Sequence, residues 1–379
     1  MINNSMFKDE FGPEQVVEVS GPKIGMKGFL VIDNTALGPG KGGIRMTPDV
    51  TVEEVFRLAR TMTWKNALAG IPFGGAKAGL VANWKSDEEK KAHVQAFARA
   101  LKSFVPEKYI AGPDVNSGEK EMRWFAEALG DWRAATGKPA DFCATVNGKK
   151  ACGLPHELGS TGFGVAQATK VAAEIYGLPI RSASVAIEGF GNVGTFAFKH
   201  LAGMGAKIVA VSDSRGAVYL ESGLDYKALN DLKKKKLSVS NYPGAKKLTK
   251  EELFALPVDV LIPAAVTDVI NEGNKDKIKA KIIVEGANIP MREETEDELW
   301  HRGIMIVPDL IANAGGVISS YAEYIGLEPA GMFAMVEEKI VKVTREILDE
   351  AKKSNKNPRQ IGLEKAKQIV LDKQKTLRK

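Results

Sequence analysis

The motif Gly189-Phe-Gly-Asn-Val-Gly194 constrains the fold of this chain more than any other stretch. It follows a short apolar segment at 184–188 with the character of a strand, and it precedes an apolar segment with the character of a helix. A GxGxxG motif in this setting is typical of a dinucleotide-binding turn. Gly189 would permit the tight turn, Gly191 would let a pyrophosphate approach the backbone, and Gly194 would pack helix against strand. The alternative is a structural glycine turn in a sheet that binds nothing.

The segments after this motif alternate between strand and helix character. Four further strands are predicted, at 206–211, 259–265, 281–288 and 303–309. Strands that alternate with helices favour a doubly wound parallel sheet. We therefore predict an α/β fold in which residues 151–344 form a Rossmann-like dinucleotide-binding domain.

Asp213 ends the strand that follows the glycine motif, 24 residues after Gly189. A carboxylate at this position accepts hydrogen bonds from the adenine-ribose hydroxyls. It favours NAD over NADP, because it would repel a ribose phosphate. Three neighbours with hydroxyl or guanidinium groups can still hold that phosphate: Ser212, Ser214 and Arg215. Both NAD and NADP therefore remain possible cofactors.

Two asparagines follow later predicted strands, where ligands of open α/β sheets bind. Asn288 lies in Gly286-Ala-Asn288, and Asn313 begins Asn313-Ala-Gly-Gly316. Their amide groups are able to bond a ribose or a carboxamide, although each is also an ordinary turn residue.

The first half reads as a separate α/β domain, residues 1–150, because 379 residues exceed the usual size of a single core. We predict a strand at 28–36, a helix that starts at Thr51 and stops near residue 70, and further helices that start at Ser86 and near residue 116. The amphipathic helices at about 345–379 can return to this first domain.

Lys77 lies among glycines and alanines in the stretch Ile71-Pro-Phe-Gly-Gly-Ala-Lys-Ala-Gly-Leu80. Glycine costs backbone entropy and permits close approach, so we expect something to come very near the backbone around Lys77. The alternative is a glycine-rich turn with an incidental lysine.

Two more lysines, Lys41 and Lys65, lie next to glycine or near a helix end. Three ammonium groups form a pocket for a small dianion, and burial with like charges lowers the pKa of the least solvated one until it can act as a base. Asp114, in a loop ahead of a predicted helix, would complete such a site as a proton carrier. Its alternative role is a helix cap.

Composition excludes several other classes of protein. The net charge of +6 is modest, and the lysine run at 233–236 has no interleaved aromatic residues, so we do not expect nucleic-acid binding. Four scattered histidines make a metal site improbable. We expect no membrane span, because no run approaches the ~18 apolar residues required, and the start of the chain has no apolar signal region. A cytoplasmic protein is the simplest interpretation. The two cysteines, Cys143 and Cys152, fit neither a Cys-x-x-Cys pair nor a disulfide framework.

Seven ordered motifs carry a family resemblance: GKGGIRM, TWKNALAGIPFGGAKAG, GPDVNSGEKEM, GSTGFGV, GFGNVG, VEGAN and NAGGVISSYAEY. Over nearly its whole length the chain resembles the glutamate/leucine/phenylalanine/valine dehydrogenases, and the glutamate enzymes most. The resemblance implies reversible oxidative deamination of an L-amino acid to a 2-oxo acid and ammonia, with NAD(P) as hydride acceptor. It also implies a homo-oligomer, usually a hexamer or octamer, whose N-terminal domain binds the substrate and mediates assembly.

The resemblance also implies roles for individual residues. Lys77 matches the catalytic lysine that activates water, and Asp114 matches the aspartate that moves protons. Lys65 matches the lysine that binds the substrate α-carboxylate. The cofactor would be held by Thr161, which matches the threonine on the nicotinamide amide, by the dinucleotide turn with Phe190, Asn192 and Val193, and by Asn288 and Asn313.

Lys41 and Ser320 occupy the two positions that distinguish substrates within the family. Both are polar, as in the enzymes that act on glutamate. A buried lysine facing a leucine side chain would be an unpaired charge, so glutamate and 2-oxoglutarate are the expected substrates. The segment TALGPGKGGIRM otherwise reads like the leucine-type version, which leaves a leucine, phenylalanine or valine dehydrogenase as the alternative. A non-catalytic dinucleotide-binding regulatory protein is the alternative from another class.

Overall fold

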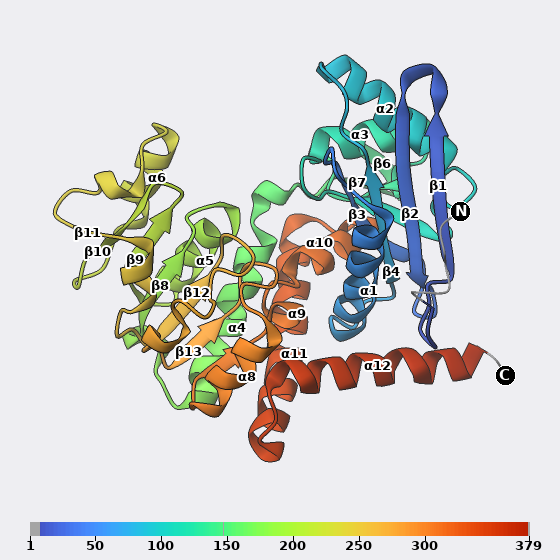
Figure 1. The fold of residues 1–379 in the computed structure, drawn as a ribbon. Helices are drawn as coiled ribbons and strands as arrows, with labels where there is room; N and C mark the ends of the chain where they lie inside the picture. The colour runs from blue at the N-terminus through green and yellow to red at the C-terminus, as the bar shows by residue number, and fades with distance from the viewer. Residues whose placement is uncertain (1–7, 147, 378–379) are drawn as a thin grey trace. The chain divides into compact units, whose positions relative to one another are not determined.

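Two β-sheets organise the chain, one in each of two units of the computed structural model, which describes residues 8–146 and 148–377 (Figure 1). Unit 1 contains the residues up to Leu158, Val317–Met335 and the residues from Glu364 on. Unit 2 contains Gly159–Gly316 and Val336–Leu363. The predicted two-domain α/β class, with a Rossmann-like second domain, is confirmed.

The sheet of unit 1 is mixed and has the strand order β1-β2-β4-β3-β5. Its strands are β1 Gln15–Gly21, β2 Met26–Asn34, β3 Gly40–Arg45, β4 Gly74–Leu80 and β5 Tyr109–Gly112. β1, β2 and β4 pair antiparallel, whereas β3 runs parallel to both β4 and β5. The central strand β4 is the glycine-rich stretch around Lys77, so the alternative of a glycine-rich turn was wrong.

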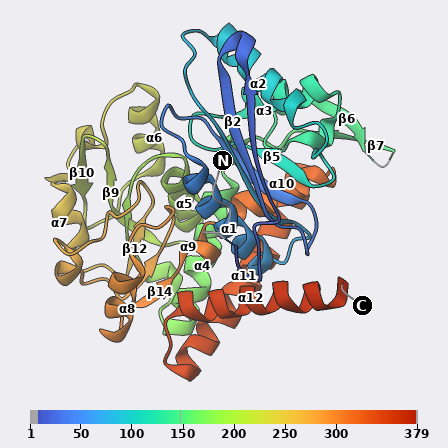
Figure 2. The ribbon, with the colours of Figure 1, turned by 45° about the vertical axis from the view of Figure 1, so that its right-hand side comes forward.

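The two faces of β4 explain its small residues. Ala76, Ala78 and Leu80 join the core formed with helices α2 (Asp87–Ala100) and α3 (Glu119–Leu129), which lie next to each other (Figure 2). On the other face lies helix α1 (Val52–Leu68), which packs against β4.

Gly75 and Gly79 flank Lys77 on the face of β4 that meets α1. A Cβ on Gly75 would overlap Thr63, and one on Gly79 would lie 2.7 Å from Val50 and 2.8 Å from Val55. The expected close approach to the backbone is therefore made by helix α1 and by Val50 just before it. Because α1 carries Lys65, this close packing also places a second lysine over the sheet.

The helices of unit 1 begin and end where the local signals predict. The Thr51 hydroxyl accepts a hydrogen bond from the Glu54 N–H, and Ser86 caps α2 in the same way. α3 ends at Gly130, whose φ of 65° is in the left-handed region that glycine tolerates. The Glu54 carboxylate does not close a capping box but bonds to Arg45.

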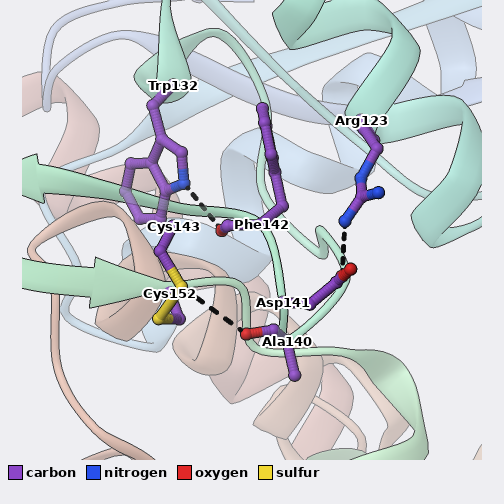
Figure 3. Close-up of a disulfide and its surroundings, with 7 residues drawn as sticks. All are labelled: Arg123, Trp132, Ala140, Asp141, Phe142, Cys143 and Cys152. Atoms are coloured by element: carbon purple, nitrogen blue, oxygen red, sulfur yellow. Dashed lines mark hydrogen bonds and ion pairs between the residues drawn. A yellow bond between two sulfur atoms is a disulfide. The ribbon is translucent and has the colours of Figure 1, made fainter.

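A disulfide joins Cys143 and Cys152, which corrects the prediction from their spacing (Figure 3). The two residues face each other in an antiparallel hairpin of β6 (Cys143–Val146) and β7 (Lys149–Cys152), with Cα atoms 4.0 Å apart. The sequence holds Asn-Gly between these strands, a strong hairpin signal. The spacing rules for cysteine motifs do not consider such cross-strand pairs.

Reduction of this disulfide is expected to destabilise unit 1. The disulfide closes a loop between two cysteines that are 9 residues apart in the sequence. Such a loop restricts the unfolded chain and thereby raises the free energy of unfolding by about 3 kcal/mol. Calorimetry with and without a phosphine reductant should therefore show a melting temperature lower by several degrees, and a Cys143→Ser, Cys152→Ser variant should melt like the reduced protein. If mass spectrometry of untreated, air-exposed protein found two free thiols, the pairing would be refuted.

The sheet of unit 2 has the order β11-β10-β9-β8-β12-β13-β14. Its strands are β8 Ser184–Glu188, β9 Lys207–Asp213, β10 Gly216–Tyr219, β11 Lys246–Leu248, β12 Val260–Pro263, β13 Ile282–Val284 and β14 Met305–Val307. Five neighbouring strands of this sheet run parallel, as predicted: β9, β8, β12, β13 and β14. β10 and β11 add an antiparallel edge that the sequence did not predict.

In unit 2 one helix, α4 (Ser160–Tyr176), precedes the first strand, and the other helices come between or after the strands (Figure 1). The latter are α5 Asn192–Gly203, α6 Tyr226–Lys234, α7 Lys250–Phe254, α8 Glu293–His301 and α9 Asp309–Ala312. Three more helices complete the chain: α10 Gly315–Tyr324, α11 Pro329–Ser354 and α12 Pro358–Leu377. Within the described part of the chain, no helix has the length and apolar character needed to cross a membrane.

Candidate active site

Lys77 and Asp114 form an ion pair in unit 1. Lys77 lies in the middle of β4, and its Nζ is 2.9 Å from Oδ2 of Asp114, which follows β5. Lys77 is only 8% exposed. The structure thus brings the expected catalytic lysine and the expected proton carrier into direct contact.

Arg45 is a second cation on Asp114 that the sequence reasoning missed. Its Nε lies 3.3 Å from Oδ2 of Asp114, and its Nη1 bonds to Glu54 at 2.5 Å. Burial alone would raise the pKa of Asp114, but the charges of Lys77 and Arg45 outweigh it and hold the pKa below its ordinary value. Strand alternation was an available signal, since Arg45 lies four residues after Lys41 and therefore on the same face of β3.

Lys41 lies on β3 with only 3% of its surface exposed. Its Nζ donates to the carbonyl of Ala111 at 3.1 Å. Burial, and then the nearby charge of Lys77, lower the pKa of Lys41 to about 7. Burial together with a like charge therefore lowers the pKa of one lysine, as predicted, and that lysine is Lys41. A Cβ on Gly112 would overlap the Lys41 ammonium group, so this glycine creates the space for it.

Lys65 and Ser320 both belong to unit 1 and lie on different helices. Lys65 is buried in the last turn of α1. Ser320 lies in α10, next to Tyr321. The ring of Tyr321 packs edge-on against that of Phe73, with ring centroids 5.5 Å apart, and Phe73 immediately precedes β4.

A buried ion pair holds α10 to the rest of unit 1. Glu323 pairs with Lys138 at 2.5 Å, with both side chains fully buried. Its carboxylate also accepts hydrogen bonds from the backbone N–H groups of Gly137 and Leu154, at 2.8 and 2.9 Å. The charge of Glu323 acts on Lys41 as well, where it raises the pKa against burial. The element that carries Ser320 is therefore electrostatically coupled to the expected substrate lysine.

A cavity of about 290 Å³ opens beside Asp114. Its lining residues are Pro113, Asp114, Ser117, Gly118, Glu119, His156 and Glu157. Asp114 therefore lines a space that can admit a small molecule, whereas the N-cap of the following helix α3 is Gly118.

The glycine turn of unit 2 has space for a pyrophosphate. Gly189 has a φ of +98°, which permits the tight turn. A Cβ on Gly194 would overlap the carbonyl oxygen of Gly189, so its absence lets α5 pack on the turn. Around a Cβ placed on Gly191, in contrast, no atom of the described chain other than those of its two chain neighbours lies within 4 Å. The open side of the turn lies at the N-terminus of α5, where unpaired N–H groups bind phosphate.

The other residues of the turn are Phe190, Asn192 and Val193; Phe190 is buried, and the other two begin α5. Lys233 also reaches this turn. Its Nζ donates to the Gly191 carbonyl at 3.2 Å and to the Thr195 hydroxyl at 2.8 Å. From the sequence we considered the lysine run at 233–236 only as a possible nucleic-acid footprint, so the structure adds a cation beside the expected phosphate site.

Asp213 ends β9, and both of its carboxylate oxygens accept hydrogen bonds. Oδ1 accepts from the Arg215 N–H at 2.8 Å and the Ser238 hydroxyl at 3.0 Å, and Oδ2 accepts from the Val239 N–H at 2.9 Å. The carboxylate thus organises the loops around the end of the strand.

The structure brings Asn288 and Asn313 together beyond the ends of β13 and β14. The Asn313 amide donates to Oδ1 of Asn288 at 2.9 Å and to the carbonyl of Ala287 at 3.1 Å. Thr161 lies in the first turn of α4, and a Cβ on Gly316 would lie 3.0 Å from its hydroxyl.

Comparisons with known proteins match both halves of the chain. Residues 153–376 match the model of the Glutamate/Leucine/Phenylalanine/Valine dehydrogenase family, and residues 13–130 match that of the Glu/Leu/Phe/Val dehydrogenase dimerisation domain. The glutamate dehydrogenase of Aeropyrum pernix is 41% identical over 326 residues, 83% of this chain and 77% of that one. The NADP-specific glutamate dehydrogenase of Saccharolobus shibatae is 39% identical over 352 residues, 88% and 80% of the two chains. The structure of the hetero-hexameric glutamate dehydrogenase from Thermus thermophilus superposes with a TM-score of 0.81 at 27% identity, covering 95% of this chain and 89% of the other.

Proposed function

The chain belongs to the glutamate/leucine/phenylalanine/valine dehydrogenase family, and we propose that it catalyses the reversible oxidative deamination of L-glutamate. The products are 2-oxoglutarate and ammonia, and NAD(P) is the coenzyme. Curated glutamate dehydrogenases about 40% identical over most of the chain support this activity and coenzyme. The observation that supports the residue assignment best is the buried contact between Lys77 and Asp114 beside Lys41.

We assign substrate binding to unit 1. Lys65 binds the α-carboxylate, and Lys41 with Ser320 binds the side-chain carboxylate. A buried ammonium group requires a negative partner, and the γ-carboxylate of glutamate is such a partner for Lys41. Neighbouring cations also draw a doubly negative substrate into the site.

Lys77 and Asp114 divide the proton transfers. When bound, NAD(P) accepts the hydride that leaves the substrate Cα. Lys77 activates the water that attacks the resulting imino carbon of the substrate. Asp114, whose low pKa keeps it ionised when the site is empty, takes a proton from the amino nitrogen and returns one as ammonia departs.

We assign the cofactor to unit 2. The open side of the turn at Gly191 and the N-terminus of α5 would hold the pyrophosphate, with Phe190, Asn192 and Val193 in the same turn. Asp213 would face the adenine ribose. Thr161, Asn288 and Asn313 would contact the nicotinamide and its ribose.

A matrix of substrates and cofactors tests the function. Reductive amination is followed by NADH or NADPH absorbance, with ammonia and either 2-oxoglutarate or 2-oxoisocaproate. We expect faster turnover with 2-oxoglutarate. If the branched acid reacted faster, the roles of Lys41 and Ser320 would be wrong and the leucine-type alternative would apply.

Binding of 2-oxoglutarate is expected to take up a proton above pH 7. Lys41 has a pKa of about 7 in the free protein, and a bound carboxylate favours its charged form and raises that pKa. At pH 8 nearly one proton per site should be taken up, and at pH 6 almost none, because Lys41 is then already charged. Calorimetric titrations in two buffers of different ionisation enthalpy, with NAD(P)⁺ and without ammonia, measure this. Equal heats in both buffers at pH 8 would contradict the prediction.

We propose that the protein is a homo-oligomer, and a hexamer in particular. The matched dimerisation-domain model supports an oligomer, and the Thermus thermophilus structure supports six subunits. We also propose a cytoplasmic location. Disulfides are rare in the cytoplasm outside hyperthermophiles. The redox state of Cys143 and Cys152 in cells therefore bears on the proposed location. Sedimentation equilibrium and thiol trapping in cell extracts test the two proposals.

A further inference from the structure

Arg359 lies in the first turn of α12, far in the sequence from every residue assigned to the cofactor. It is 8% exposed and contacts three buried carboxylates. One guanidinium nitrogen is 2.7 Å from Glu285 and 2.9 Å from Asp309, and Nε bonds to Glu296. Asn357 caps the helix by accepting from the Arg359 N–H at 2.8 Å, which sets the position of the residue.

In the described part of the chain, Arg359 is the cation that pairs with all three carboxylates of this cluster. Burial is the main reason that the pKa of Glu296 lies at about 7 and that of Glu285 lies well above its ordinary value, although the charge of Arg359 acts to lower both. Without the guanidinium, the carboxyl groups would lose the ion pairs that hold them around one point and the charge that favours their ionised forms. The cluster therefore depends on Arg359 for its geometry.

Asp309 connects this cluster to the asparagine pair. Its Oδ2 accepts a hydrogen bond from the Ile289 N–H at 3.0 Å, while its Oδ1 contacts Arg359. Ile289 directly follows Asn288 and has a φ of +47°. A β-branched residue in the left-handed region is a true outlier that its surroundings must hold in place.

We propose that Arg359 is a positioning residue for the nicotinamide side of the cofactor site. It holds Asp309 so that the carboxylate keeps Ile289 in its left-handed conformation. This conformation turns the Asn288 amide toward Asn313, which donates to it at 2.9 Å. The inference rests on the proposed function only in assigning this asparagine pair to the cofactor.

The test measures NADPH and NADH binding to the full chain by fluorescence, independently of turnover. In Arg359→Met, relaxation of a strained backbone is expected to weaken binding roughly tenfold. KM for 2-oxoglutarate at saturating cofactor should change less than twofold. The double variant Arg359→Met, Asp309→Asn should recover most of the affinity, because a neutral amide oxygen accepts from Ile289 without a counter-charge.

Arg345→Met is the matched control, since this arginine of α11 makes an exposed ion pair with Glu174. It should bind cofactor like the unmodified protein. If Arg359→Met does not fold, Arg359→Lys, which keeps the charge but cannot reach all three carboxylates, is judged by the same criteria.

Cofactor binding within twofold of the unmodified protein would overturn the inference. A fall in cofactor affinity accompanied by a comparable rise in KM for 2-oxoglutarate would also overturn it. So would a double variant that does not recover cofactor affinity. These results are distinct from failure of the proposed function, in which the unmodified protein binds cofactor but does not convert 2-oxoglutarate.

Discussion

Replacing Lys77 by alanine is expected to lower kcat by roughly a thousandfold, the typical effect of removing a positioned proton-transfer group. The ammonium group that activates water is lost, and so is the closest counter-charge of Asp114. Cofactor binding, measured by NADPH fluorescence, should remain unchanged, because Lys77 lies in unit 1 and the glycine turn lies in unit 2. A kcat within tenfold of the unmodified protein would remove Lys77 from the mechanism.

Two further variants sharpen this result. Lys27→Ala is the matched control, since this lysine of β2 is exposed, pairs with Glu18 and lies over the ring of Phe29. It should leave kcat unchanged. The double variant Lys77→Ala, Asp114→Ala should lose little more than either single variant, because residues that act as a unit have strongly non-additive effects.

Replacing Lys41 by leucine and Ser320 by valine is expected to exchange the substrate preference. The γ-carboxylate of 2-oxoglutarate would then be buried without its partner, a loss of about 3–5 kcal/mol. This corresponds to a fall in kcat/KM of roughly a hundredfold to a thousandfold or more. Activity with 2-oxoisocaproate should rise, since its branched side chain fits an apolar pocket.

Parallel assays of both acids measure this exchange. Lys108→Leu serves as the control, because Lys108 is an exposed lysine immediately before β5. A variant that retained its preference for 2-oxoglutarate would show that Lys41 and Ser320 do not contact the γ-carboxylate, and another cation of unit 1 would then have to be sought.

The dinucleotide-binding half of the fold was predictable from the sequence because its signals are local. A Cβ on Gly194 would meet the carbonyl of Gly189 in the same turn and Ile187 in the strand just before it. The five parallel strands were likewise visible as short apolar segments. The same locality explains why Thr51 and Ser86 predicted helix starts correctly.

The glycines around Lys77 were recognised as important, but their purpose was not. Their partner is helix α1, which lies before them in the sequence and packs on them only when the sheet forms. Periodicity could not distinguish this small-residue central strand from a turn. The pairing of Cys143 with Cys152 was missed because it depends on hairpin register, which the cysteine spacing does not encode.

The sequence by itself determined the family and the Rossmann-like fold of unit 2, and it nominated the glycine turn and the candidate site residues, since each of these resides in contiguous motifs. Only the tertiary structure decided which charges meet. It joined Lys77 to Asp114, added Arg45 to them, lowered the pKa of Lys41, and placed Arg359 among three distant carboxylates. The physical reason is that electrostatic interactions depend on distance and burial in space, and both are set by packing between elements that are far apart in the chain.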